Sequence, residues 1–390
     1  MAVPNLRFKR EDGSEYPEWT AAAIEDITEK QSLPVKVNPK EEYREIGIRS
    51  HGKGLFYKEP VLGKELGNKR VFEIVPNCLI VNIVFAWERA VARTTENEIG
   101  MIASHRFPMY KSKEDILDLD YMVRYLITDR GKLLLELASP GGAGRNRTLG
   151  QKEFAKSRLP LPCIEEQRKI AAFLVELDNM ISVCQDEVEN LEQQKKAIMQ
   201  KIFSQEIRFK RKDGTEFPEW EEKQLVELLD YEQPTKYIVQ STKYDNYYKT
   251  PVLTAGQSFI LGYTDEINGI YIADSNKPVI IFDDFTTSFH WVNFQFKVKS
   301  SAMKILTPNS KDICFYYIFT AMQTISYIPK EHSRQWISRY SQFTIPYPCL
   351  EEQQKIADFL SEYDTAIQAA REELEKWQEL KKGLLQQMFV

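Results

Sequence analysis

The sequence lacks long apolar runs and has little cysteine. A representative run, Val279 to Phe282, is closed by Pro278 and Asp283 after four residues, whereas a helix needs about 20 apolar residues to span a bilayer. Three basic residues among the first ten leave no apolar signal core. Five widely spaced cysteines in 390 residues are too sparse for a disulfide scaffold and suggest reduced thiols. We therefore predict a cytoplasmic protein without a membrane segment.

An excess of positive charge is also missing, although DNA-binding domains are usually basic. The formal net charge is −5, but it is unevenly distributed. Residues 20–158 hold 23 basic and 19 acidic side chains, and residues 221–344 hold 12 and 13. Residues 165–203 hold 5 and 8, and residues 351–390 hold 5 and 9. The acid is concentrated in two stretches that both have the pattern of helices, so the net charge does not exclude a nucleic-acid partner.

Motifs for catalysis, cofactors and metals are missing as well. No Asn/Asp-Pro-Pro-Tyr/Phe motif of an amino-methyltransferase is present, and the segment from Gly63 to Lys69 lacks the Gly-Lys-Ser/Thr ending of a phosphate loop. The glycines of 139–144 follow a leucine-rich segment and indicate a loop. No Asp/Glu-x-Lys completes a nuclease site with Asp283 and Asp284, and the four histidines pair with no cysteine at zinc spacing. We expect no catalytic residue, no cofactor and no metal site.

Two strings of the sequence occur twice, so the chain is an internal repeat. Residues 6–19 recur at 207–220, and residues 159–170 recur at 345–356, while the stretches between them show no comparable likeness. We predict two unlike domains, each beginning with the shorter repeat, that alternate with two copies of a helix. The predicted segments are 1–158, 159–206, 207–344 and 345–390.

The shorter repeat predicts a hairpin. Asp12-Gly13 and Asp213-Gly214 are turn dipeptides flanked by alternating residues, which is typical of a tight hairpin. A tryptophan, Trp19 or Trp220, closes each copy. Because large aromatic side chains are mostly buried, we expect both tryptophans to be core residues.

The longer repeat leads into a coiled-coil pattern. Apolar residues recur at alternating spacings of four and three over 170–202 and again over 356–388, interrupted in each copy by one lysine, Lys195 or Lys381. Only a supercoil keeps so long a 3.5-residue period facing one partner. Pairs of glutamates occupy the first turn of both helices, where carboxylates suit the positive end of the helix dipole.

The obvious partner of one seam is the other, and a two-fold relation between the repeats makes the pair antiparallel. With full overlap Lys195 would face Tyr363, and Lys381 would face Leu177. Each lysine stem can then run along the seam to its edge, or the lysine only restricts alternative registers.

The ends of the chain also match the repeat. Val390 corresponds to Ser204 and Leu6 to Ile207, so a chain joined tail to head would continue the pattern with about three extra residues. We therefore predict a closed pseudo-two-fold molecule, of which a circular permutant opened near Ser204 should fold.

The duplicated motif Pro-x-Pro-Cys-[Ile/Leu]-Glu-Glu-Gln-x-Lys-Ile-Ala, each copy leading into a long helix with unlike domains between, resembles the specificity subunits of type I restriction-modification enzymes along essentially the whole chain. The resemblance implies an α+β fold with two α/β target recognition domains joined by two long antiparallel coiled-coil helices. It implies a non-catalytic subunit whose domains each read one half of a bipartite target in double-stranded DNA. The implied partners are two methyltransferase (modification) subunits and, in the full enzyme, two restriction subunits that translocate DNA.

Candidate DNA-binding residues are polar side chains near expected loops, because loops usually carry recognition, arginine commonly reads guanine, and asparagine or glutamine reads adenine. In the first domain they are Trp87, Arg89, Arg93, Ser104, His105, Arg106, Gly142, Gly144, Arg145, Asn146 and Arg147. In the second domain they are Thr254, Gly256, Gln257, Thr286, Thr287, Ser288, His290, Trp291, Ser333, Arg334, Gln335, Trp336 and Arg339. The last group in each domain follows a helical stretch, expected at 121–138 and 313–325. For any one of these residues the alternative is surface salt bridging or packing.

Two other functions fit the same pattern. The chain could be a coiled-coil scaffold that binds no DNA, although a plain tether needs no pair of unlike domains. It could also be a stand-alone DNA-binding regulator. Co-purification of a methyltransferase subunit in a two-to-one ratio distinguishes the specificity subunit from both.

Overall fold

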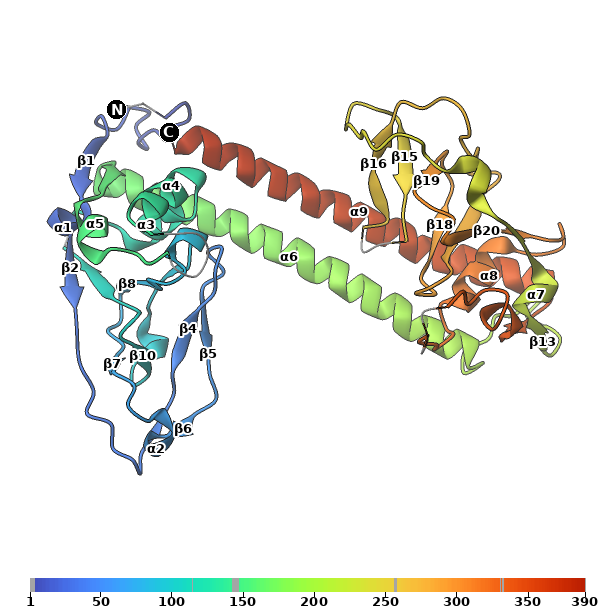
Figure 1. Ribbon diagram of the computed structural model, residues 1–390, viewed down its shortest axis with the longest axis horizontal. Helices are drawn as coiled ribbons and strands as arrows, with labels where there is room; N and C mark the ends of the chain where they lie inside the picture. Colours follow the sequence, from blue (N-terminus) through green and yellow to red (C-terminus); the bar gives the residue numbers. More distant parts are fainter. Residues whose placement is uncertain are drawn as a thin grey trace. The chain divides into compact units, whose positions relative to one another are not determined.

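Two long helices, α6 (Ile164–Phe203) and α9 (Leu350–Met388), carry the repeated pattern (Figure 1). The computed structural model describes residues 4–113, 115–141, 147–255, 258–329, 331 and 333–389. The chain divides into two compact units: unit 1 is Met1–Asp186 with Arg371–Val390, and unit 2 is Glu187–Ala370. Each unit therefore contains a part of both long helices.

Unit 1 is built on an antiparallel sheet in the order β2-β11-β8-β9. Its strands are β2 (Thr28–Gln31), β11 (Met109–Ser112), β8 (Cys78–Val81) and β9 (Val91–Arg93). Four further strand pairs join β1 (Thr20–Ala23) to β12 (Arg158–Leu161), β3 (Glu42–Tyr43) to β6 (Val61–Leu62), β4 (Ile46–Ile48) to β5 (Leu55–Tyr57), and β7 (Val71–Glu73) to β10 (Ile102–Ser104). The short helices are α1 (Ile24–Ile27), α2 (Gly63–Leu66), α3 (Leu119–Leu126), α4 (Asp129–Leu137) and α5 (Gln151–Lys156).

The helical stretch expected over 121–138 is two helices. The Asp118 carboxylate caps α3 by accepting from Tyr121 N at 2.9 Å, and the Thr128 hydroxyl caps α4 by accepting from Gly131 N at 3.1 Å. Because a side-chain cap satisfies the free amides that open a helix, the second cap makes Thr128 a boundary between two helices.

Unit 2 has a sheet in the equivalent order, β14-β20-β17-β18. Its strands are β14 (Leu229–Glu232), β20 (Met303–Pro308), β17 (Val279–Asp283) and β18 (Phe289–Val292). A three-stranded sheet contains β16 (Ile260–Thr264), β15 (Thr250–Leu253) and β19 (Lys297–Val298), and β13 (Glu221–Gln224) pairs with β21 (Thr344–Tyr347). Helices α7 (Leu225–Leu228) and α8 (Phe315–Met322) complete the unit, so the helical stretch expected over 313–325 is shorter by five residues. The run from Val279 to Phe282 is fully buried, as expected for a central strand.

The repeated segments form the same frame in both units. Each hairpin turns at a glycine of positive φ, Gly13 at 83° and Gly214 at 86°, where a side chain would be strained. A buried tyrosine then ties each domain to the strand before its long helix: Tyr121 Oη donates to Pro160 O at 2.8 Å, and Tyr317 Oη donates to Pro346 O at 2.7 Å. The predicted hairpins and the α+β fold class are confirmed.

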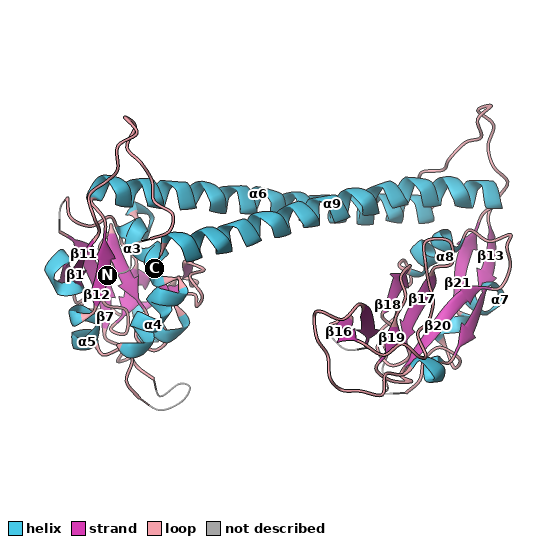
Figure 2. Ribbon diagram, turned by 90° about the horizontal axis from the view of Figure 1, so that it is seen from above, coloured by secondary structure: helices cyan, strands magenta, loops and turns pink. Residues whose placement is uncertain are grey.

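The long helices pack along the predicted seam within each unit. In unit 1 the start of α6 lies beside the end of α9, and Lys381 bonds to Asp178 (Figure 2). In unit 2 the end of α6 packs against the start of α9, and Lys195 bonds to Asp364. Each lysine was expected to face Tyr363 or Leu177, and each instead forms an ion pair with the next residue of the chain, Asp364 or Asp178. No helix of the described chain is long and apolar enough to cross a membrane.

The start of the chain lies on the end of α9 just as the second domain starts on the end of α6. Leu6 N donates to Gln387 O at 3.2 Å, and the corresponding Ile207 N donates to Lys201 O at 3.1 Å. The same backbone contact therefore occurs in both copies of the repeat, and only the covalent link between the helix and the following segment is absent in one of them.

We expect a circular permutant that joins residue 390 directly to residue 1 and opens at Ser204 to be soluble and to unfold within a few degrees of the parent chain. Thermal unfolding followed by circular dichroism measures the difference. A permutant opened inside β17, in the core of unit 2, is the control and should not fold. An insoluble Ser204 permutant would contradict the closure.

Candidate DNA-binding surface

Three loops of each unit occupy equivalent places in the two folds. The first is the hairpin loop, 49–54 between β4 and β5 and 254–259 between β15 and β16. The second joins the last two strands of the main sheet, 82–90 and 284–288. The third follows the helices α4 and α8. Loops held together at one end of a rigid sheet are a common way to build a binding surface.

In unit 1 the first two loops are joined by backbone hydrogen bonds. His51 N donates to Glu88 O at 2.7 Å, and Gly52 N donates to Arg89 O at 2.9 Å. The hydroxyl of Ser50 adds a third bond, to a Glu88 carboxylate oxygen at 2.7 Å. The third loop joins them through Arg147, whose guanidinium carbon lies 5.8 Å from the centre of the Trp87 ring. The structure thus places the predicted Arg147 of the third loop over the predicted Trp87 of the second.

Two of the predicted arginines of unit 1 are occupied by partners within the unit. Arg89 donates to Ile127 O at 3.1 Å and lies 3.7 Å from the Asp129 carboxylate. Arg93 bonds to the Asp120 carboxylate and donates to Asn77 Oδ1 at 2.9 Å. For Arg93, at the far end of β9, the salt-bridging alternative describes the side chain.

The other predicted residues of unit 1 lie on a turn or outside the described chain. Ser104 ends β10, and the exposed His105 and Arg106 follow it in the turn to β11. Arg106 O accepts from Ile83 N at 3.0 Å. This contact places the turn next to loop 82–90. Gly142, Gly144, Arg145 and Asn146 lie outside the described residues.

In unit 2 a side-chain turn shapes the second loop. The Asp283 carboxylate accepts from Phe285 N at 2.9 Å and from the Thr286 hydroxyl. Thr286 and Ser288 are exposed, whereas Thr287 is buried and has a φ of 60°. The predicted Thr287 therefore shapes the loop from inside, and its neighbours face outward.

The hairpin loop of unit 2 packs on β18. The rings of Phe259 and His290 stack with their centres 3.9 Å apart. Partial burial of the His290 ring lowers its pKa and so favours the neutral form. Thr254 N closes the loop by donating to Phe259 O at 2.9 Å, while Gly256 and Gln257 lie outside the described residues.

Two predicted DNA-binding side chains of unit 2, Gln335 and Trp336, are buried, and a third, Trp291, is partly buried against the core. Trp336 and Gln335 are each 2% exposed, and Gln335 Nε2 donates to Ser333 O at 2.8 Å. Trp291 packs against Phe315 of α8 with ring centres 5.1 Å apart. Gln335 and Trp336 anchor the third loop, whereas the predicted Ser333, Arg334 and Arg339 are exposed on it.

A buried aspartate of the second loop of unit 2, Asp284, bonds to the third loop and to β20. Asp284 is fully buried and lies 3.3 Å from the ammonium of Lys304, which is 1% exposed. The other carboxylate oxygen of Asp284 accepts from Trp336 N at 2.8 Å, and Asp284 O accepts from Gln335 N at 2.8 Å. Asp284 therefore has a structural role in positioning the loop.

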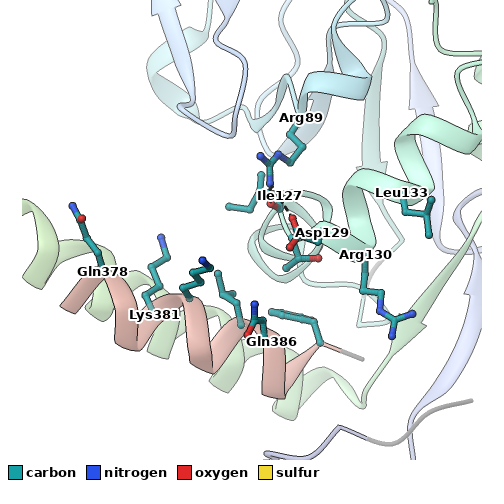
Figure 3. A pocket seen from close by; sticks show the side chains of 12 residues that line it. Arg89, Ile127, Asp129, Arg130, Leu133, Gln378, Lys381 and Gln386 are labelled. Carbon is teal, nitrogen blue, oxygen red and sulfur yellow. Dashed lines mark hydrogen bonds and ion pairs between the residues drawn. The ribbon is translucent and has the colours of Figure 1, made fainter. Parts of the chain in front are cut away.

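A basic groove of about 690 Å³ adjoins the loops of unit 1, between α4 and the last turns of α9 (Figure 3). Arg89, Arg130, Lys381 and Lys382 line it together with a single acid, Asp129. Its walls also contain four apolar side chains, those of Ile127, Leu133, Leu385 and Phe389. The excess of cations suits an anionic ligand.

Sequence reasoning missed loop 49–54, which lies beside the predicted Trp87 and Arg89. The available signal was a polar run with two glycines, Gly52 and Gly54, between short apolar segments. The flanking strands have only three residues each, so their alternation was too brief to indicate a hairpin.

Comparison with known proteins identifies a family for part of the chain. Residues 218–376 match the family model described as type I restriction modification DNA specificity domain. That segment belongs to the type I specificity family. The resemblance drawn from the duplicated motif is thereby confirmed, and the match contains all three loops of unit 2. The internal repeat relates the corresponding frame of unit 1 to this specificity domain.

Two relatives and one solved structure resemble parts of the chain that range from about two fifths to its full length. The type I restriction enzyme EcoR124I/EcoR124II specificity subunit of Escherichia coli is 49% identical over 153 residues, which are 38% of this chain and 37% of that protein. A putative type I restriction enzyme MjaX specificity subunit of Methanocaldococcus jannaschii is 28% identical over 61% of this chain and 60% of its own length. The chain thus spans less than two thirds of the length of either relative. The S subunit of a type I restriction-modification system from M. genitalium has the same fold, with a TM-score of 0.62 at 14% identity over 100% of this chain and 99% of that one.

Proposed function

We propose that this chain is the DNA specificity subunit of a type I restriction-modification system, in which each unit binds one half of a bipartite target in double-stranded DNA. The observation that carries this function is the convergence of three unlike loops at equivalent places on two copies of one frame. The frame contacts are equal in the two units to within a few tenths of an ångström, as in the two tyrosine bonds at 2.8 and 2.7 Å. The loops differ in both sequence and charge.

This division fits the physical requirements of reading two sequences. Phosphate contacts position a protein on DNA and are alike at any sequence, whereas contacts to base edges must differ for different bases. A duplicated frame supplies equal positions, and its loops supply different contacts. A coiled-coil scaffold that binds no DNA has no need of this difference.

The partners follow from the same function. We propose that two methyltransferase subunits dock on the subunit, with the acidic long helices as a protein-facing surface, and that two restriction subunits join in the full enzyme. The chain itself is then non-catalytic and works in the cytoplasm, where its DNA is. The lengths of α6 and α9 set the number of base pairs left unread between the half-sites, so removing whole turns from both should change the spacing and leave the half-sites unchanged.

Methylome sequencing of the host with and without this chain tests the function. We expect one bipartite methylated motif to disappear with the chain, and the chain to co-purify with methyltransferase subunits in a one-to-two ratio. Expression of the chain in a deletion strain is the control and should restore the same motif. An unchanged methylome, with a lone chain that binds DNA tightly, would favour the stand-alone regulator.

A further inference from the structure

The two hairpin loops are structural equivalents. In unit 1 the pair Ile48 and Leu55 precedes a closing bond from Arg49 N to Gly54 O of 2.9 Å. In unit 2 the pair Leu253 and Ile260 precedes a closing bond from Thr254 N to Phe259 O of 2.9 Å. Both bonds enclose four residues, so the two loops have the same length. Each begins directly after the last pair of its hairpin strands.

The two hairpin loops differ in charge. Loop 49–54 carries Arg49, His51 and Lys53, all exposed, and no acidic residue. The loop 254–259 has no charged residue in its sequence. Among the described residues no hydrogen bond or ion pair engages the ammonium of Lys53, while the Arg49 guanidinium donates to Leu55 O at 2.9 Å. Lys53 is therefore a cation available to a ligand.

The backbone of loop 49–54 has a fixed shape. His51, Gly52 and Gly54 have φ values of 62°, 67° and 74°. Two amides of the loop bond to loop 82–90, and a Cβ on Gly52 would lie only 2.6 Å from Ile127 Cγ2. Because Ile127 also lines the basic groove, the loop borders that groove. A preformed loop loses little conformational entropy when it binds.

We infer that loop 49–54 reads bases in the half-site bound by unit 1, with Lys53 donating to a guanine. The inference rests on the proposed function and deepens it. A cation that contacts only phosphate would be expected at both equivalent loops, because the phosphate backbone is the same in both half-sites. A cation present at only one of them matches a base that differs, and lysine or arginine on guanine O6 and N7 is the common pairing.

The variant Lys53→Ala, assembled with its methyltransferase subunits, tests this role on duplexes that carry the methylated motif and all its single-base substitutions. We expect discrimination to fall about tenfold at one guanine of one half-site, because a specific base contact is lost, and to stay unchanged across the other half-site. Equilibrium binding at two salt concentrations provides the measurement. Lys64→Ala, on the exposed surface of α2, is the matched control and should discriminate like the parent.

Two results would overturn the inference. Equal weakening for all duplexes, with a smaller dependence on salt by about 0.9 in the logarithmic slope, would make Lys53 a phosphate contact. Binding indistinguishable from that of Lys64→Ala at every position would remove the loop from the interface. If the parent complex itself preferred no duplex, the proposed function would fail and this inference with it, which the parent measurement reveals before any variant is made.

Discussion

Glu352→Ala is expected to destabilise unit 2 by about 3 kcal/mol, and Glu166→Ala to do the same to unit 1. Both carboxylates are fully buried at the start of a long helix. Glu352 accepts from Arg208 Nη2 at 3.1 Å and from Trp220 Nε1 at 2.8 Å. The equivalent distances at Glu166, from Arg7 and Trp19, are 2.7 and 3.0 Å. One carboxylate thus holds both the arginine and the tryptophan of each shorter repeat.

The size of the effect follows from what the alanine leaves behind. The Arg208 side chain is only 21% exposed, and its charge loses its buried partner and keeps only the exposed Glu219 at 3.7 Å. The hydrogen bond to Glu352 raises the pKa of Arg208, and the guanidinium stays charged in the variant. The indole N–H of Trp220 loses its acceptor as well, which adds a desolvation cost.

Amide hydrogen exchange of the intact chain provides the measurement, because it reports each unit separately. We expect Glu352→Ala to lower protection in β13 and β21, and Glu166→Ala to lower it in β1 and β12. The exposed neighbours Glu351→Ala and Glu165→Ala are matched controls and should change stability by less than about 1 kcal/mol, the range of a helix-dipole contact. Equal effects of buried and exposed glutamates would contradict the role of the carboxylates.

The glutamates show where sequence reasoning stops. Their position in the first turn predicted a contact with the helix dipole, and the structure places all four in that turn. The role of Glu166 depends on Arg7, which is 159 residues earlier in the chain, and no local pattern reveals such a contact. The available signal was that the arginine, the tryptophan and the glutamate all recur at equivalent positions in both copies of the repeat.

The coiled coil was predicted more fully because its register follows from period and symmetry alone. The seam placed Lys195 opposite Tyr363, and the structure pairs it with the adjacent Asp364. Asp364 also accepts a hydrogen bond from the hydroxyl of Tyr316. This contact could not be predicted, because Tyr316 belongs to the domain that is not repeated. In unit 1 an arginine of α3, Arg124, bonds to the equivalent aspartate.

The sequence predicted which segments form the loops of the candidate surface, but not which of their side chains are exposed. Polar residues after a buried strand indicated the second loop of unit 2, and polar residues after a helical stretch indicated the third. Residue type does not reveal direction within a loop, so Trp336 and Gln335, which point into the core, were included with the exposed Arg334. An aromatic or amide side chain inside a loop can support it as well as extend from it.

Asp284→Ala is expected to cost unit 2 about 3 to 5 kcal/mol, because it leaves the ammonium of Lys304 buried without a counter-ion. Trp336 N loses its side-chain acceptor in the same change, so the loop 333–339 loses one of its two bonds to Asp284. We expect both the stability of unit 2 and the reading of its half-site to fall. Asp230→Ala, at an exposed aspartate of β14, is the control for the stability measurement and should be close to neutral.

A double variant separates the two effects. Asp284→Leu with Lys304→Met replaces the ion pair by apolar groups of similar size, which is often neutral for stability, so most of the lost protection of β17 and β20 should return. The bond to Trp336 N does not return, because leucine accepts no hydrogen bond. Methylation assays on substituted targets should then still show relaxed reading of the unit 2 half-site in the stable double variant, while the unit 1 half-site is read as in the parent. Full recovery of both stability and reading would contradict the role of Asp284 in placing the loop, and would leave it a partner of Lys304 alone.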